Sequence, residues 1–319
     1  MNVPEGAKAK VFIDGEAGTT GLQIRERLAS EAGIDVLSID PAKRKDAEAR
    51  KDMMRACDLV VLCLPDDAAK EAVALAAELG GDAPKIVDAS TAHRVAPGWV
   101  YGFAELEAGQ AGRIANARYV ANPGCYPTGA IALLRPLADA SLLPADFPIT
   151  VNAVSGYSGG GRSMIESYEV AKTAPAFELY ALGLEHKHIP ELMAYARLER
   201  RPIFIPSVGN FRQGMLVSIP LHLDLLPGNV TLNRLEDALA AHYAGAAQVR
   251  VVREAAAKIT RLDVRGLNGT DALELYVFGK GALNQALLVA RLDNLGKGAA
   301  GAAVQNLKLM LGVQAPSSH

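Results

Sequence analysis

Short, almost uninterrupted apolar runs in the first third of the chain limit its fold more than any other pattern does. They cover residues 10–14, 59–64 and 85–88, and segments with helical spacing separate them. Runs without polar alternation are typical of strands that are buried on both faces. This part of the chain is therefore predicted to form a parallel α/β sheet with helices on both sides.

The first apolar run leads into a glycine-rich turn and then a helix. Three glycines punctuate the turn, and apolar residues recur at helical spacing over 22–28. Glycines permit a tight turn and the close approach of a pyrophosphate, whose charge the helix N-terminus stabilises. Strand, glycine loop and helix in this order predict a Rossmann-like dinucleotide site. Its expected contacts are Gly15, Gly18, Thr19, Thr20 and Gly21.

The next predicted strand, residues 34–39, ends where the adenosine ribose of a dinucleotide is normally recognised. Asp40 would suit a free 2′-hydroxyl, whereas Lys43, Arg44 and Lys45 would suit a 2′-phosphate. Alternatively, Lys43, Arg44 and Lys45 could simply form a basic turn that is exposed to solvent. The residues by themselves therefore leave NAD and NADP open.

A cysteine in a second turn is the predicted nucleophile. Cys125 follows an extended run at residues 119–121 and precedes an apolar helix that is expected to open at Thr128. At a helix N-terminus the positive end of the dipole favours thiolate, the nucleophilic form. Cys57 and Cys63 lie in or beside apolar runs and fit buried core thiols.

Other candidate contacts follow the remaining predicted strands. In a parallel sheet, ligands bind beyond the carboxyl ends of the strands. Pro65 and Ser90 each follow such a strand, and so does the turn at residues 122–125. We therefore expect the nucleophile on the same edge of the sheet as the cofactor, and Pro65 and Ser90 among the cofactor contacts.

The pattern changes from residue 147 onward. Strand-like segments with β-branched alternation, a helix at residues 231–243 and a final helix at 298–311 follow. They predict an α+β domain with a mainly antiparallel sheet, whose broad face could form a subunit contact. The final helix is expected to return to the first domain. The expected domains are 1–124 with 299–319 for the nucleotide and 125–298 for catalysis and oligomerisation.

Two polar segments of the second half carry further candidates. The glycine-rich loop from Ser155 to Arg162 could present backbone N–H groups and a guanidinium to an anion, although a flexible linker is the alternative. His186 and His188 lack a third metal ligand, so a base or acid beside a thiol suits them better. Arg212 could bind an anion or pair with an acid.

Charge and composition exclude several classes of protein. A net charge of −2 does not indicate the basic surface that nucleic-acid binding requires. No segment approaches the roughly 18 apolar residues of a membrane span, and the first ten residues contain no apolar signal region. The three cysteines lack disulfide or zinc spacing. We expect a cytoplasmic enzyme with a small-molecule substrate, without a metal ion, nucleic acid or membrane partner.

A thiolate, a histidine and a nicotinamide pocket together suggest hydride transfer to a carbonyl that is held as a thioester, formed by attack on an acyl phosphate. Six motifs support this interpretation and resemble the N-acetyl-γ-glutamyl-phosphate reductase family, in its shorter, type 2 branch. They are Gly15-x-x-Gly-x-x-Gly21, Asp88-Ala-Ser-x-x-x-Arg94, Tyr101-Gly-Phe-x-Glu-Leu106, Asn122-Pro-Gly-Cys-Tyr-Pro-Thr128, Ser155-Gly-Tyr-Ser-Gly-Gly-Gly-Arg162 and Glu185-His-Lys-His-x-Pro-Glu191.

The resemblance implies the fold of the glyceraldehyde-3-phosphate and aspartate-semialdehyde dehydrogenase superfamily. It also implies NADPH-dependent reduction of N-acetyl-γ-glutamyl phosphate to N-acetylglutamate 5-semialdehyde and phosphate, a step of arginine biosynthesis. Cys125 would be the nucleophile and His188 the favoured acid/base, with His186 competing for that role. The NADPH preference favours Lys43 and Arg44 over Asp40.

Similarity to aspartate-semialdehyde dehydrogenases assigns two more roles. It implies that Arg94 holds the acyl phosphate and that Asn152 steadies the thioester. Candidates for the acetamido and carboxylate ends of the substrate are Ser155, Arg162 and Arg212. A homo-oligomer, either a dimer or a tetramer, is expected.

Two other functions stay open at this point. The substrate could be a related acyl phosphate, either aspartyl phosphate or the carrier-linked aminoadipyl phosphate of lysine synthesis. The chain could also be a nucleotide-sensing protein that keeps the fold without the chemistry.

Overall fold

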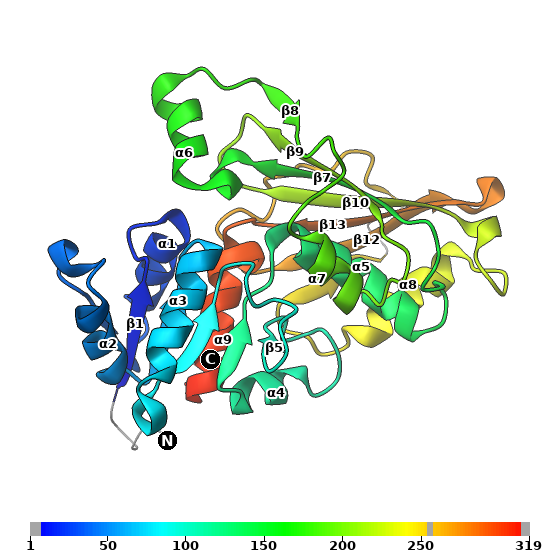
Figure 1. Ribbon diagram of the computed structural model, residues 1–319. Coiled ribbons are helices and arrows are strands. Elements are labelled where there is room, and N and C mark those ends of the chain that lie inside the picture. The colour runs from blue at the N-terminus through cyan, green and yellow to red at the C-terminus, as the bar shows by residue number, and fades with distance from the viewer. Residues whose placement is uncertain (1–7, 254–257, 314–319) are drawn as a thin grey trace. The chain divides into compact units, whose positions relative to one another are not determined.

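The apolar runs in the first third of the chain form strands of one parallel sheet, as predicted (Figure 1). The computed structural model describes residues 8–253 and 258–313. The chain divides into a first unit, Met1–Ala104, Ala108–Pro123 and Ala299–His319, and a second unit, Glu105–Glu107 and Gly124–Gly298. These bounds differ from the expected ones at Gly124 and at the tripeptide Glu105–Glu107. The motif that ends at Leu106 gave no sign that these residues belong to the second unit.

In the described part of the first unit, the strand order is β2-β1-β3-β4-β6-β5 and all pairs are parallel. The strands are β1 (Ala9–Asp14), β2 (Ile34–Leu37), β3 (Leu59–Leu62), β4 (Lys85–Asp88), β5 (Val100–Tyr101) and β6 (Tyr119–Ala121). The helices are α1 (Thr19–Leu28), α2 (Ala47–Arg55), α3 (Asp66–Ala77), α4 (Gln110–Asn116) and α9 (Gly301–Leu311).

The sheet of the first unit is buried on both faces because successive side chains of each strand point to opposite sides. Val11 and Ile13 of β1 pack with α1, α4 and α9, whereas Phe12 packs with α2 and α3. Leu307 and Met310 of α9 belong to the first of these cores. The final helix therefore completes the first unit.

The second unit is built on a mixed sheet with the strand order β11-β12-β13-β10-β7-β9-β8. Its strands are β7 (Thr150–Gly156), β8 (Phe177–Leu179), β9 (Ile203–Gly209), β10 (Met215–His222), β11 (Val249–Val251), β12 (Leu273–Lys280) and β13 (Gln285–Leu292). Its helices are α5 (Cys125–Asp139), α6 (Gly161–Glu166), α7 (Ile189–Tyr195) and α8 (Leu232–His242). Most strand pairs are antiparallel, as predicted.

Helix α5 covers one face of this sheet, and α7 and α8 pack beside it (Figure 1). At Gly129 of α5, an added Cβ would lie 2.9 Å from Val217 and 3.2 Å from Ala290. Glycine thus lets the helix backbone lie directly on β10 and β13. Within residues 8–253 and 258–313, none of the helices combines the length and apolar character that crossing a membrane requires.

Several helix starts differ from the sequence prediction. Helix α5 begins at Cys125 rather than at Thr128, whose hydroxyl instead donates to the carbonyl of Gly124. The glycine-rich loop after β7 is ordered as a 3-10 turn (Tyr157–Gly160) followed by α6. A π-helical turn (Gly296–Ala300) precedes α9. In each case the turn residues indicate only approximately where the helix begins. The backbone hydrogen bonds determine its first residue.

Candidate active site

The glycine loop between β1 and α1 has the geometry that a dinucleotide pyrophosphate requires. Gly15 has a φ of +93°, and a Cβ there would lie 2.3 Å from the carbonyl oxygen of Cys63. A Cβ on Gly21 would lie 2.6 Å from the carbonyl oxygen of Gly15. Gly18 caps α1, and Thr19 and Thr20 are its first residues. The loop thus forms a close turn that only glycines permit, and it fits a bound pyrophosphate.

A cluster of charged groups lies just beyond β2 in the same unit. Glu16 accepts from Arg25 (2.7 Å) and from Arg44 (3.0 Å), and Arg25 also donates to the Ser38 hydroxyl (2.6 Å). Ser38 is the first residue after β2, the position from which Rossmann-like sheets recognise the ribose. Of these residues, only Arg44 was expected from the sequence.

The other expected cofactor contacts have different surroundings. Asp40 accepts from the backbone of Ala42 and caps a short 3-10 turn, Pro41–Lys43. Lys43 and Pro65 are exposed. Ser90 is buried and its hydroxyl donates to Asp88 (2.7 Å). Ser90 therefore secures its own loop, whereas Lys43 and Pro65 remain open to solvent.

Arg94 donates hydrogen bonds to backbone carbonyl groups within the first unit. Its side chain is buried, its Nε donates to the carbonyl of Asn122 (3.0 Å), and a terminal nitrogen donates to the carbonyl of Ala89 (3.4 Å). These bonds brace the end of β6, three residues before Cys125 in sequence. The guanidinium that was expected to hold an acyl phosphate thus also supports the backbone that leads to the thiol.

In the second unit, Cys125 is the first residue of α5 and is partly exposed. The backbone N–H of Gly124, the helix N-cap, donates to the buried carboxylate of Glu191 (3.1 Å). Because Cys125 is the first residue of this helix, its thiol lies at the positive end of the helix dipole. Burial raises the pKa of Cys57 to about 12 and that of Cys63 to about 12, so these two thiols stay protonated at neutral pH.

Two tyrosines beside Cys125 were not predicted as site residues. Tyr126 is buried and its hydroxyl donates to the carbonyl of Ser207 (2.9 Å). Burial, the Tyr180 hydroxyl and Cys125 raise the pKa of Tyr126 above its ordinary value. Burial and Cys125 also raise the pKa of Tyr180 to about 12, although its hydrogen bond with Tyr126 acts the other way. Both phenols are therefore neutral hydrogen-bonding groups near the thiol.

The two histidines belong to the same cluster of rings. The ring centroid of Tyr126 lies 6.0 Å from that of His188 and 6.3 Å from that of His186, and the two imidazoles are 4.6 Å apart. Nδ1 of His186 accepts the backbone N–H of His188 (3.1 Å). Accepting at Nδ1 leaves the proton of a neutral His186 on Nε2. His186 therefore shapes the turn that carries His188, the buried N-cap of α7.

Asn152 lies on the opposite face of the sheet from α5. It pairs with Ser218, whereas the adjacent pair, Ala153 and Val217, shares the face on which α5 packs. Because neighbouring residues of a strand point to opposite faces, Asn152 lines the groove on the far side. Asn152 thus lies on the sheet face opposite α5, and its role beside the thioester stays a prediction. Ser155, three residues on, faces α5 and interacts with Tyr126.

The three residues that were expected to bind anions differ in their exposure and in their partners. Arg162, the second residue of α6, is exposed. Arg212 is half-exposed and forms an ion pair with Glu169, which also accepts from the Tyr157 hydroxyl (3.1 Å). Ser155 is buried and donates to the carbonyl of Gly156. Arg212 thus pairs with an acidic residue, which was the alternative to anion binding that the sequence left open.

Two family models match the chain. The model described as "Semialdehyde dehydrogenase, NAD binding domain" covers residues 10–114, and "Semialdehyde dehydrogenase, dimerisation domain" covers residues 125–294. Proteins named N-acetyl-gamma-glutamyl-phosphate reductase from Brucella ovis and Brucella canis are each 57% identical over 311 residues. These alignments cover 96% of this chain and 99% of each relative.

Solved structures share the fold at low identity. Aspartate semialdehyde dehydrogenase II from Vibrio cholerae superposes with a TM-score of 0.70 at 16% identity, over 97% of this chain and 99% of that one. The NADP complex of the Candida albicans enzyme gives 0.64 at 14% identity, over 95% and 98% of the two chains. The predicted two-part fold, a parallel nucleotide-binding sheet with an α+β domain, is thereby confirmed.

Proposed function

Because this chain belongs to the N-acetyl-gamma-glutamyl-phosphate reductase family, we propose that it reduces N-acetyl-γ-glutamyl phosphate to N-acetylglutamate 5-semialdehyde and phosphate with NADPH. Family membership confirms the predicted resemblance, the oxidoreductase class and a dinucleotide cofactor. The observation that carries the mechanism is a thiol at the N-terminus of α5, with both histidines in the ring cluster around Tyr126.

Cys125 supplies the nucleophile. Its sulfur attacks the acyl carbon of the substrate, a C–S bond forms, and the bond to the phosphate oxygen breaks. The α5 dipole stabilises the attacking thiolate. NADPH, when bound, supplies the hydride that reduces the resulting thioester. His188 then takes the hydroxyl proton back, the carbonyl re-forms as the carbon–sulfur bond breaks, the aldehyde leaves, and the thiolate of Cys125 is restored.

His188 handles the proton, and His186 and the tyrosines position it. His188 accepts the thiol proton of Cys125 and returns it to the developing oxygen anion. The hydrogen bond to Nδ1 of His186 holds the His188 backbone, so His186 orients this turn. Tyr180 stays a neutral donor across the working pH range.

The first unit holds the cofactor. The glycine loop and the first turn of α1 would receive the pyrophosphate, and Arg25, Arg44 and Ser38, which Glu16 and Arg25 link to one another, would hold the 2′-phosphate. Glu16 draws the two guanidinium groups together in the protein without cofactor. Lys43 adds an exposed cation to this end of the site.

We predict that Ser38→Asp reverses part of the cofactor preference. A carboxylate at the position next to the 2′-phosphate repels NADPH, so the ratio of kcat/KM with NADPH to that with NADH should fall roughly 10- to 100-fold. Steady-state rates with both cofactors measure this ratio. Asp40→Ser is the matched control, because Asp40 caps its own turn and should leave the ratio unchanged. The reverse ranking of the two variants would assign the ribose to Asp40.

Four residues are proposed to contact the substrate. Arg94 is the proposed contact for the acyl phosphate, and Ser155, Arg162 and Arg212 are the proposed contacts for the acetamido and carboxylate ends. Arg212 must exchange its pair with Glu169 for the substrate carboxylate. A cytoplasmic location suits a catalytic thiol, which must stay reduced.

A second copy of the chain covers the sheet face opposite α5. That face has a groove of about 740 Å³ lined by Leu216, Leu287 and other apolar side chains, with Phe177 and Leu179 exposed. Exposed apolar area of this kind marks an interaction surface, and the matching family model is a dimerisation domain. The proposed assembly is therefore a dimer or a pair of dimers built on this sheet.

Leu287→Arg is expected to produce monomers, because it introduces a charge into the apolar interface. Sedimentation velocity at micromolar concentration should show at least a roughly 100-fold weaker self-association. Leu225→Arg, at an exposed leucine that does not line the groove, serves as the control and should leave the assembly intact. Unchanged assembly of the Leu287 variant would place the interface elsewhere.

The function is tested by reduction of NADP⁺ with N-acetylglutamate 5-semialdehyde, with and without phosphate, beside aspartate semialdehyde and NAD⁺. Phosphate-dependent turnover with the acetylated aldehyde is expected. Turnover with aspartate semialdehyde alone would favour aspartyl phosphate as the substrate. Turnover with neither would require a test of the aminoadipyl aldehyde on its carrier, and failure there would favour a nucleotide-sensing protein.

A further inference from the structure

The backbone of Gly298 lies directly against the proposed nucleophile. A Cβ added at residue 298 would lie 3.0 Å from Cβ and 3.4 Å from Cα of Cys125. The N–H of Gly298 donates to the carbonyl of Asp293 (3.0 Å), in a segment that is buried throughout. The position of this backbone therefore limits where the Cys125 side chain can lie.

The residue before Gly298 is a buried lysine with three oxygen partners. Lys297 is 1% exposed, and its Nζ donates to both carboxylate oxygens of Glu105 (2.9 and 2.7 Å) and to the side-chain oxygen of Gln248 (2.8 Å). An ammonium has three N–H donors, so these bonds fix its direction completely. A lysine held in this way fixes the backbone of its neighbour, Gly298.

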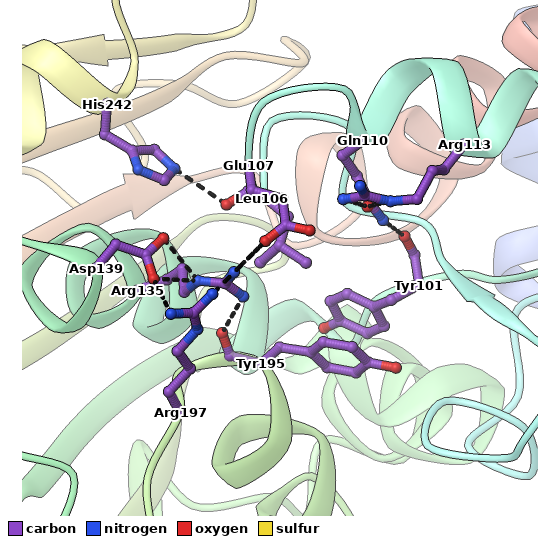
Figure 2. A network of polar contacts seen from close by, with 10 residues as sticks. All are labelled: Tyr101, Leu106, Glu107, Gln110, Arg113, Arg135, Asp139, Tyr195, Arg197 and His242. Atoms are coloured by element: carbon purple, nitrogen blue, oxygen red, sulfur yellow. Dashed lines mark hydrogen bonds and ion pairs between the residues drawn. The ribbon is translucent and has the colours of Figure 1, made fainter.

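Glu105 is itself anchored through the two residues that follow it. Nε2 of His242 donates to the carbonyl of Leu106 (3.0 Å), and Glu107 forms an ion pair with Arg135 of α5 (Figure 2). Figure 2 also shows Arg135 in a two-bond pair with Asp139. The tripeptide Glu105–Glu107 thus connects Lys297 to the helix that begins at Cys125.

We propose that the ion pair between Lys297 and Glu105 positions Cys125 for attack by holding the Gly298 backbone against it. Stability alone is a poor reason for this pair, because buried ion pairs are often replaceable by apolar residues without loss. Their directional bonds do fix geometry, which a reacting thiol needs, since a displacement of about 1 Å can cost 10²-fold in rate. The inference rests on the proposed function only in taking Cys125 as the nucleophile.

The test combines three variants with two readouts. Lys297→Met removes the ammonium and leaves Glu105 buried without its lysine; Glu105→Gln with Lys297→Met removes both charges. The control is Lys308→Met, because Lys308 forms the same kind of two-bond pair with Glu31 (2.8 and 2.8 Å) in the first unit. The readouts are kcat with N-acetylglutamate 5-semialdehyde and the rate at which iodoacetamide alkylates Cys125 as a function of pH, with the modified peptide identified by mass spectrometry.

Both Lys297 variants should lose roughly 10- to 100-fold in kcat, with KM for the cofactor unchanged and an altered pH profile of alkylation. The single variant should also unfold at lower temperature, and the double variant should recover that stability without recovering the rate. A double variant with wild-type kcat and alkylation would overturn the proposal, as would losses no larger than those of Lys308→Met. If the wild-type protein turns over no aldehyde, the alkylation profile still decides the positioning role.

Discussion

Replacement of Cys125 by serine will lower phosphate-dependent oxidation of N-acetylglutamate 5-semialdehyde by at least about 10³-fold. A serine hydroxyl is almost wholly protonated at neutral pH, so the attack that forms the covalent intermediate is lost. NADPH affinity should stay within about twofold, because the glycine loop and the Arg25–Arg44 cluster lie in the first unit. Turnover and NADPH fluorescence titration measure the two quantities.

Cys57→Ala provides the control for this variant. Cys57 is buried in the core around α2, and its sulfur donates to the carbonyl of Met54 (3.4 Å). Its removal should lower the melting temperature through lost packing, while kcat stays near the wild-type value. Persistent turnover of the Cys125 variant would exclude the thioester route and require direct reduction of the substrate.

The second large effect is expected at His188. His188→Asn should lower kcat about 10²- to 10⁴-fold, the usual contribution of one acid/base, and should remove a limb of the kcat–pH profile. Because the pKa of Tyr180 is raised to about 12, that phenol contributes no limb between pH 5 and 9. A limb that disappears in one histidine variant and persists in the other therefore belongs to that histidine.

His186→Gln is the matched comparison. A glutamine carbonyl can accept the backbone N–H of His188, as Nδ1 of His186 does, so the loss should be about tenfold or less. If the glutamine variant loses more activity than His188→Asn and abolishes the pH limb, His186 is the acid/base. The geometry would then make His188 the orienting residue.

The first unit was largely predictable because local pattern and tertiary packing agree there. Apolar runs gave the buried strands of the sheet, and the glycines of the loop between β1 and α1 fall where a Cβ would collide. Short elements such as β5 and α4 gave no comparable signal, since two to seven residues contain too little periodicity.

The site residues that the sequence did not indicate act through long-range contacts. Arg25 has the spacing of a solvated helix face, and only the folded chain brings it to Ser38 and Glu16. Tyr180 follows an exposed strand and meets Tyr126 across more than fifty residues. No local pattern encodes such pairs, so motif spacing could not identify them.

The position of Asn152 on the sheet face opposite α5 has a simple geometric source. Family similarity placed an amide in the right strand, but a shift of one residue exchanges the two faces of a sheet. Ser155 has the parity that points toward α5, and Asn152 has the other. Buried and half-buried positions alternate along β7 in the structure, with Ser155 buried and Asn152 half-buried.

The packing of α9 under the parallel sheet bears on how the chain is made. Val11 and Ile13 share a core with Leu307 and Met310, which lie almost 300 residues later in the sequence. Every residue of the second unit has been synthesised before that helix appears. The first unit therefore cannot complete its core until the whole second unit has been made, and until then α1 and α4 cover only part of that sheet face. This departs from the usual N-terminal-first order and leaves apolar surface of the first unit exposed for longer during synthesis.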